Sequence, residues 1–337
     1  MKHFFVLIFF FVTLPFRFLA NPEDSLKVLL LKVKEASYFD AARLFTAGQK
    51  ALKYAEQNNL KDKALPEITI YYGNYFYYTR QIDSSAAYFK KALALARSSN
   101  SSHFEMLAKI RLFYIDWEYG LMQNTDDELN ILLLECLQQK DFENELEIYN
   151  LMGITQEEKG EYKKAVECYI KGLSRAELNN LEYYQATFLN NIGLEKYNLG
   201  ENEKALTDFK RGISIATKIN NQRLLSHIKM NACLVLVSQN KFNEADVSFK
   251  EVIGYANTNK LPLELASSYV NLASAYLSKK EYAKGINYVD SAILVFRKFN
   301  LKKEEVKALM SKCNILLEFN KVKEAESKAQ DLSINIQ

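Results

Sequence analysis

The chain repeats itself every 40 residues, and this period constrains its fold more than any other feature of the sequence. When the stretch from residue 149 is placed over the stretch from residue 189, Gly153 falls on Gly193. The same register runs forward to Cys233 and back to Gly73. A short unit can bury its apolar side only against its neighbours. The period therefore predicts an elongated stack of units rather than one compact core.

About eight units cover residues 23–333. Their expected bounds are 23–61, 66–100, 104–140, 146–180, 186–220, 226–260, 266–300 and 306–333. The pattern is clearest in the four units between residues 146 and 300. Residues 21–337 are therefore predicted to form a single solenoid domain.

Each unit has the pattern of two helices joined by a short polar turn. The first helix carries a small residue near its middle, such as Gly153. The second carries Ala165, Tyr169 and Gly172 at positions i, i+4 and i+7, which share one face. Helices approach closely where side chains are small, and the aromatic ring fills the adjacent gap. Since the chain has only 11 glycines and 4 prolines, an all-α fold of antiparallel helix pairs is predicted.

These positions resemble the tetratricopeptide repeat, and the resemblance covers nearly all of residues 23–333. The usual period of that family is about 34 residues. The 40-residue period is similar to the longer-helix variant of kinesin light chains and bacterial sensors. The resemblance implies a right-handed superhelical α-solenoid of about eight antiparallel helix pairs. It also implies that the first helices line a concave face that binds a protein or peptide partner.

The N-terminal 20 residues have the layout of a secretory signal peptide. Lys2 precedes a run of apolar residues from Phe4 to Phe16, which is too short to span a bilayer comfortably. Cleavage after Ala20 would leave a mature chain, although Phe18 is bulkier than the usual residue near a cleavage site. An uncleaved membrane anchor is the alternative. Export to the periplasm or the medium is expected. Because no cysteine lies near residue 20, a lipid anchor is not expected.

Charge and composition give no sign of a nucleic-acid partner or of a reactive centre. Lysine and arginine number 44 against 41 acidic residues, without a basic arm or run. The sequence has no phosphate-binding glycine loop and no Ser/His/Asp or Cys/His set. His103 and His227 are the only histidines outside the leader, so no metal site or cofactor is expected. The four cysteines are interpreted as buried apolar residues, with a disulfide left open.

Asparagines recur on the face that should line the groove. Asn191, Asn231 and Asn271 are spaced by 40 residues, and Asn150 and Asn190 stand at the preceding position. The resemblance implies that they hydrogen-bond the backbone of an extended peptide. A carboxamide both donates and accepts, so it can match one peptide unit. The alternative is that these side chains bond neighbouring helices across the junctions between units.

Apolar residues surround these asparagines in the same register. They include Leu194, Tyr197, Met230 and Leu234. An apolar floor with polar rungs suits a peptide or helix with hydrophobic anchors. The alternative for each is ordinary packing against the next unit.

An aromatic stretch, residues 71–78, divides into two sets in this register. Gly73 should lie at the close contact between helices, with Tyr72 and Phe76 in the core and Tyr75 against the preceding unit. The groove-side residues are predicted to be Tyr71, Asn74, Tyr77 and Tyr78. Tyrosine offers apolar area with a polar tip, so these residues form a candidate aromatic wall.

Two functions fit these observations. The first is an exported, non-catalytic interaction protein that holds a protein or peptide in its groove. The second is an orphan or truncated sensory-input module of a bacterial two-component type system. A regulator with phosphatase-like action would require a cytoplasmic location, which the leader opposes. The sequence predicts no membrane contact beyond an uncleaved leader and carries no signal for an oligomeric state.

Overall fold

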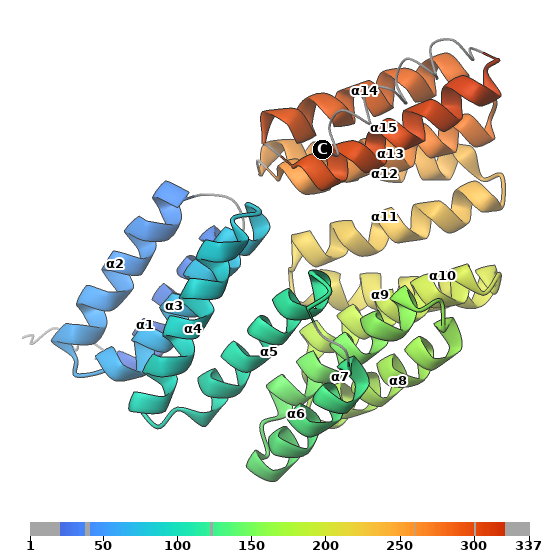
Figure 1. Cartoon of the computed structure of the whole chain (residues 1–337). Helices are drawn as coiled ribbons and strands as arrows, with labels where there is room; N and C mark the ends of the chain where they lie inside the picture. Colours follow the sequence, from blue (N-terminus) through green and yellow to red (C-terminus); the bar gives the residue numbers. More distant parts are fainter. Residues whose placement is uncertain (1–20, 38–40, 122–123, 260, 300, 321–337) are drawn as a thin grey trace, which may run out of the picture.

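The structure is a computed structural model that describes residues 21–37, 41–121, 124–259, 261–299 and 301–320. Within these ranges it contains fifteen helices and no strand (Figure 1). The helices are α1 (Pro22–Ala36), α2 (Ala41–Gln57), α3 (Lys61–Tyr78), α4 (Ile82–Ser98), α5 (Ser102–Glu118), α6 (Thr125–Gln139), α7 (Phe142–Glu158), α8 (Tyr162–Leu178), α9 (Glu182–Asn198), α10 (Asn202–Lys218), α11 (Gln222–Ser238), α12 (Phe242–Thr258), α13 (Pro262–Ser278), α14 (Tyr282–Lys298) and α15 (Lys302–Glu318). The expected leader and the end of the last unit lie outside the described residues.

The 40-residue period is built from two 17-residue helices and two short turns. From α7 onward every helix has 17 residues, and α7, α9 and α11 begin at Phe142, Glu182 and Gln222. These helices start about four residues before the unit bounds expected from the sequence. The longer period thus adds one turn to the N-terminal end of each first helix.

Turns between helices use residues that tolerate a left-handed backbone. Gly160, Asn180, Gly200 and Asn220 have φ values of +75°, +55°, +79° and +53°. Glycine and asparagine adopt this conformation at the lowest cost. The turn after α7 is closed by Glu161, whose backbone N–H donates to the carbonyl of Gln156 at 2.9 Å. The placement of Gly or Asn every 20 residues in this stretch is therefore explained by the turns.

Small residues and aromatic rings meet where the two helices of a unit approach. A Cβ atom built on Gly153 would lie 2.1 Å from Cε1 of Tyr169, and one on Gly193 would lie 2.7 Å from Cε1 of Phe209. Tyr169 and Phe209 are fully buried. The predicted close contacts in these units are thus present.

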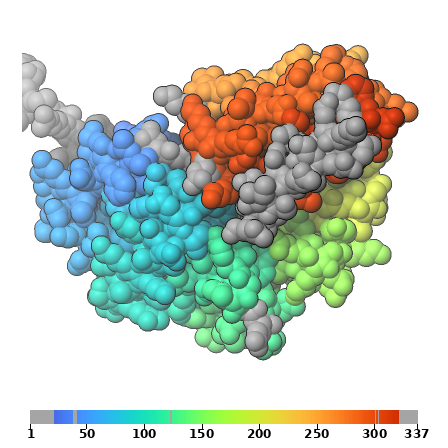
Figure 2. Space-filling model, turned by 45° about the horizontal axis from the view of Figure 1, so that its top comes forward, coloured from blue at the N-terminus to red at the C-terminus, as the bar shows by residue number. Residues whose placement is uncertain are grey.

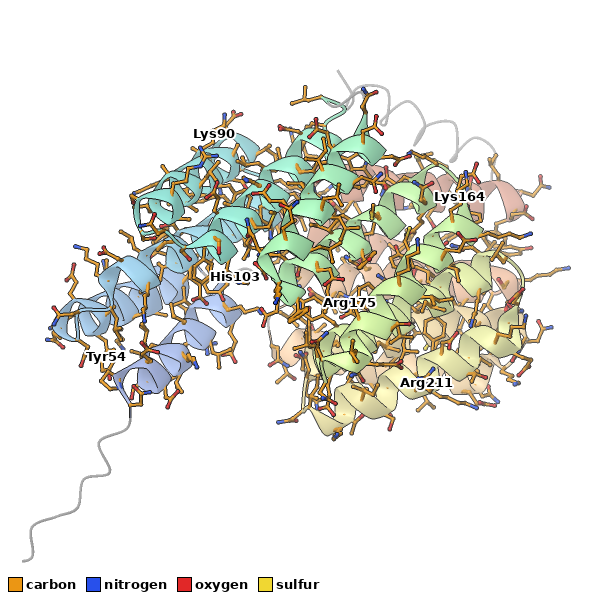
Figure 3. All side chains as sticks on the ribbon, turned by 90° about the horizontal axis from the view of Figure 1, so that it is seen from below. Tyr54, Lys90, His103, Lys164, Arg175 and Arg211 are labelled. Carbon is orange, nitrogen blue, oxygen red and sulfur yellow. The ribbon has the colours of Figure 1, made fainter. Side chains whose placement is uncertain are left out.

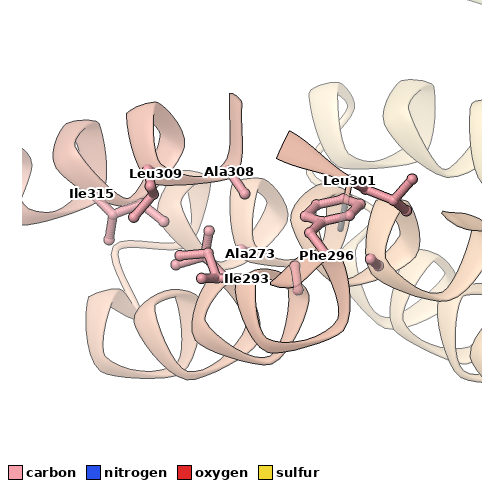
Figure 4. Close-up of a cluster of buried hydrophobic side chains, with 10 residues drawn as sticks. Ala273, Ile293, Phe296, Leu301, Ala308, Leu309 and Ile315 are labelled. Atoms are coloured by element: carbon pink, nitrogen blue, oxygen red, sulfur yellow. The ribbon is translucent and has the colours of Figure 1, made fainter. Parts of the chain in front are cut away.

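The hydrophobic core is a series of clusters between successive helices. One cluster joins α13, α14 and α15 through Ala273, Ile293, Phe296 and Ile315 (Figure 4). Backbones approach within 8 Å only between helices that are adjacent or next but one among those described. This is the packing of a superhelical α-solenoid, the predicted fold class. None of the described helices is long and apolar enough to cross a lipid bilayer.

Candidate functional site

Four asparagine side chains form a hydrogen-bonded chain across α7, α9 and α11. Asn191 Nδ2 donates to Asn150 Oδ1 at 2.8 Å, and Asn231 Nδ2 donates to Asn190 Oδ1 at 2.9 Å. Asn190 Nδ2 also donates to Asn191 Oδ1 at 3.1 Å. We call these four residues the amide ladder. Two of its three bonds join neighbouring first helices, as the packing alternative describes.

The amide ladder follows a fixed rule of spacing, and the rule explains where it stops. Each bond between units runs from an asparagine to the residue 41 positions earlier. At the next junction the corresponding partner of Asn271 is Met230, whose thioether sulfur is only a weak acceptor. The half-buried side chain of Asn271 makes no hydrogen bond to another described residue. Asn271 is therefore a rung without a protein partner among the described residues.

The amide ladder also keeps hydrogen-bonding capacity of its own. A carboxamide has two N–H donors and an oxygen with two lone pairs. Asn190 and Asn191 each use one donor and one lone pair in the amide ladder, Asn231 one donor and Asn150 one lone pair. All four are only partly buried. Their remaining donors and acceptors can pair with a ligand without breaking the amide ladder.

Apolar residues near the amide ladder contribute to packing between units. Leu194 and Tyr197 lie against the buried cluster that contains Ala186 and Phe209. Met230 lies against the next cluster, around Cys233. Leu234 is half-buried. The first three thus match the packing alternative, and a ligand would meet only their exposed edges.

A charged network that the sequence analysis missed lies at the junctions of α5, α7 and α9. Arg111 Nη1 donates to Glu147 Oε2 at 3.0 Å, and Tyr184 Oη donates to the other carboxylate oxygen at 3.0 Å. Burial raises the pKa of Glu147, but the charge and hydrogen bond of Arg111 outweigh it, so the pKa lies below its ordinary value. Burial raises the pKa of Tyr184 well above its ordinary value. The bonded residues are 36 and 37 positions apart in the sequence, so the 40-residue period does not reveal this network.

The predicted aromatic wall is mostly engaged within the protein. Tyr77 packs edge-on against Tyr114 of α5 and donates a hydrogen bond to Glu118. Tyr78 lies edge-on to Tyr77, and the guanidinium carbon of Arg223 lies 6.0 Å from its ring centre. The two rings thus contact α5 and α11.

The other residues of the aromatic stretch are also placed. Tyr71 Oη donates to Glu67 at 2.7 Å, and Tyr71 and Tyr75 lie against the N-terminal core cluster. Burial raises the pKa of Glu67 above its ordinary value. Phe76 stacks on Tyr88 of α4 with ring centres 5.0 Å apart. Asn74 is half-buried and makes no side-chain hydrogen bond to another described residue.

A small hollow of about 390 Å³ lies where α5 and α7 begin, and its lining includes His103, Asp141 and Asn179. His103 Nδ1 lies 3.0 Å from Asp141 Oδ2. Burial lowers the pKa of His103, but the hydrogen bond and charge of Asp141 outweigh it, so the pKa is raised. Figure 3 labels His103. It also labels Arg175 on α8, whose Nε donates to Glu145 Oε1 at 2.6 Å.

The described part of the chain has no cluster suited to a metal ion and no reactive thiol at Cys136 or Cys233. No group of three or more His, Cys, Asp or Glu side chains there could hold a metal ion. Cys136 and Cys233 are fully buried, and burial raises the pKa of each thiol to about 12. Both thiols are therefore protonated and unreactive at neutral pH.

The family model of the tetratricopeptide repeat matches residues 146–177, 186–218 and 266–298. The chain therefore contains tetratricopeptide repeats in these three stretches. Each matched repeat starts about four residues after its first helix begins, so the additional turn of these tetratricopeptide repeats precedes the family pattern. His103, Arg223 and Glu264 all lie in such additional turns. This segment, absent from the shorter repeat, carries several charged contacts between units.

Solved tetratricopeptide-type solenoids resemble this one in fold. A Rap protein in complex with competence and sporulation factor is 12% identical, with a TM-score of 0.68 over 94% of this chain and 87% of that chain. The quorum sensor NprR from B. thuringiensis in its apo form is 14% identical, with a TM-score of 0.62 over 95% of this chain and 90% of that chain. NprR in complex with its cognate peptide NprX is 16% identical, with a TM-score of 0.53 over 76% of this chain and 74% of that chain. A search of curated proteins gave no match.

Proposed function

We propose that this chain is an exported, non-catalytic binding protein that holds an extended peptide or protein segment along its concave face. The observation that carries the proposal is the open carboxamide of Asn271 beside the amide ladder. A peptide unit presents one N–H and one C=O, and a carboxamide can pair with both. Such contacts hold the backbone without reading side chains, which suits an extended segment.

The residues around the amide ladder support a largely neutral ligand at the C-terminal end of the groove. Residues 267, 270 and 274 on α13 are serine, valine and serine, and none carries a charge. Toward the N-terminal end the charged network of Arg111 and Glu147 takes over. A ligand that spans the groove would therefore meet an uncharged end and a charged end.

Fold similarity gives this proposal a context. The Rap protein was solved with competence and sporulation factor and NprR with its cognate peptide. Sequence identities of 12% and 16% support only the architecture, so the ligand of this chain is inferred from its own side chains. The sensory-input alternative is supported by the description of NprR as a quorum sensor.

Peptide display tests the binding proposal. A random peptide library is panned on residues 21–337, and selected peptides are measured against Asn271→Ala and Asn231→Ala. Loss of one or two ligand hydrogen bonds is expected to weaken binding about tenfold or more. Asn257→Ala is the matched control, since Asn257 is an exposed asparagine on α12. Unchanged affinity in both groove variants would reject the peptide site.

Fractionation tests export separately. The proposal expects the protein outside the cytoplasm with residues 1–20 removed, as mass spectrometry of the purified chain would show. A cytoplasmic chain that retains Met1 would reject the exported location and leave the groove proposal standing. A partner found to be a membrane kinase or regulator would favour the sensory-input function.

A further inference from the structure

Among the described residues, distant units of the solenoid meet through side chains and not through backbone packing. No pair of described helices further apart than next but one packs backbone against backbone. Yet Arg80, in the turn after α3, forms an ion pair with Glu304 at the start of α15. Figure 2 shows the N-terminal units in blue and cyan lying against the C-terminal units in orange and red. The superhelical turn is therefore closed by side chains.

The repeat register places no cation of the preceding first helix opposite Glu304. In the preceding unit Arg223 pairs with Glu264, 41 residues later, at 2.8 Å. The same spacing places Leu263 opposite Glu304. The side chain of Glu304 is only 15% exposed, and a buried carboxylate without a cation is costly. Arg80 supplies the cation from the other side of the turn.

Arg80 is held in a position to do this. Its backbone φ is +60°. At the equivalent turn position of the next three units, residues 120, 160 and 200, the chain has glycine. An arginine in the left-handed region costs about 1 kcal/mol relative to glycine. Its other guanidinium nitrogen bonds Glu118 at 3.0 Å, and its guanidinium lies 5.8 Å from the ring centre of Tyr77. Glu118 and Tyr77 thus hold the guanidinium group in addition to its ion pair with Glu304 of α15.

A second contact lies next to the first. The ring of Tyr78 lies 6.0 Å from the guanidinium carbon of Arg223, at the start of α11. Arg80 and Tyr78 therefore connect the second unit to the eighth and to the sixth. We call Tyr78, Arg80, Arg223 and Glu304 the clasp.

We propose that the clasp holds the solenoid in a closed turn and that its release widens access to the concave face. The clasp consists of one ion pair and one cation–π contact, with no backbone packing behind them among the described helices. Such a junction can open without unfolding any helix pair. An extended peptide would enter the groove when the clasp is open and leave slowly when it is closed. The access step rests on the proposed peptide function, whereas the closed turn does not.

Small-angle X-ray scattering of residues 21–337 tests the closed turn without any ligand. Glu304→Gln removes the ion pair, and the expected result is a larger radius of gyration and a longer maximum dimension than in the parent. Glu305→Gln is the matched control, because Glu305 is adjacent on α15 but pairs with Arg297 of the preceding helix at 2.6 Å. Arg80→Gln is a second variant and should expand the solenoid in the same way. Circular dichroism confirms that each variant keeps its helix content.

Two results would overturn the clasp. One is scattering from folded Glu304→Gln and Arg80→Gln that superimposes on that of the parent. The other is an equal expansion in Glu305→Gln, which would show a general loosening. For the access step, association and dissociation of a display-selected peptide should both accelerate in Glu304→Gln, by about threefold or more. If the variant expands but the rates do not change, the closed turn stands and its control of access is rejected.

Discussion

Asn231 donates a 2.9 Å hydrogen bond to Asn190, although 41 residues separate them in the chain. The two side chains belong to consecutive first helices, α11 and α9. The same relation links Asn191 to Asn150. The protein itself therefore orders these side chains, which would lower the entropic cost of binding the ligand proposed for them.

Asn190→Ala should destabilise the solenoid, because Asn190 takes part in two bonds of the amide ladder. At about 0.5–1.5 kcal/mol for each bond, the loss is about 1–3 kcal/mol. Urea unfolding followed by circular dichroism measures it. Asn257→Ala on exposed α12 should stay within about 0.5 kcal/mol of the parent. Equal effects of the two substitutions would show that the amide ladder contributes nothing specific.

Met230→Asn should extend the amide ladder by one rung, since it places an acceptor 41 residues before Asn271. Methionine packing is lost there, so the net stability change is small. A double-mutant cycle with Asn271→Ala isolates the new bond, with an expected coupling of about 0.5–1.5 kcal/mol. Peptide affinity should also fall, because Asn271 then has a protein partner. No coupling would mean that the 41-residue rule does not describe the junction.

Gly153→Ala should destabilise the fourth unit, because its Cβ would lie 2.1 Å from Cε1 of the Tyr169 ring. Overpacking of this kind costs about 1–3 kcal/mol. Gly254→Ala is the control on α12, where no atom lies within 4 Å of an added Cβ. That substitution should raise the unfolding midpoint, since alanine favours a helix by up to about 1 kcal/mol over glycine. Urea midpoints that move in the same direction would contradict the close-contact account.

Stability should decrease as pH rises from about 4.5 to about 7, because Glu195 is fully buried beside Glu157 and Tyr169. Burial, and then the charge of Glu157, raises the pKa of Glu195 from 4.5 to about 7. The folded chain then holds this proton more tightly than the unfolded chain. Its contribution is present below pH 4.5 and lost above pH 7, with a loss of about 3 kcal/mol.

Glu195→Gln tests this pH dependence, because glutamine resembles the protonated acid. The variant should be more stable than the parent at pH 8, with a flatter profile between pH 5 and pH 7. The equivalent positions in other units hold uncharged residues, namely Ile115, Thr155, Val235, Ala275 and Ile315. The packing at this position therefore does not require an acid. A steeper or unchanged profile in thermal unfolding across this range would contradict the assignment.

The sequence predicts the local packing well and the long-range contacts poorly. Periodicity placed Gly153 against its aromatic partner, because the same contact recurs between Gly73 and Phe89 and between Gly193 and Phe209. It placed Asn191 and Asn231 on one face, but could not choose between ligand and protein partners. That choice depends on a one-residue shift between neighbouring helices. The pair of Arg80 and Glu304 depends on the curvature accumulated over six units, which no local pattern records.

Hydrogen exchange of residues 21–337, with and without a display-selected peptide, tests the central claim most directly. A peptide on the concave face should protect first helices α9, α11 and α13 and leave second helices α10, α12 and α14 unchanged. Protection is expected to be greatest in α13 around Asn271. Protection confined to the second helices, or none at saturating peptide, would contradict the concave face as the binding surface.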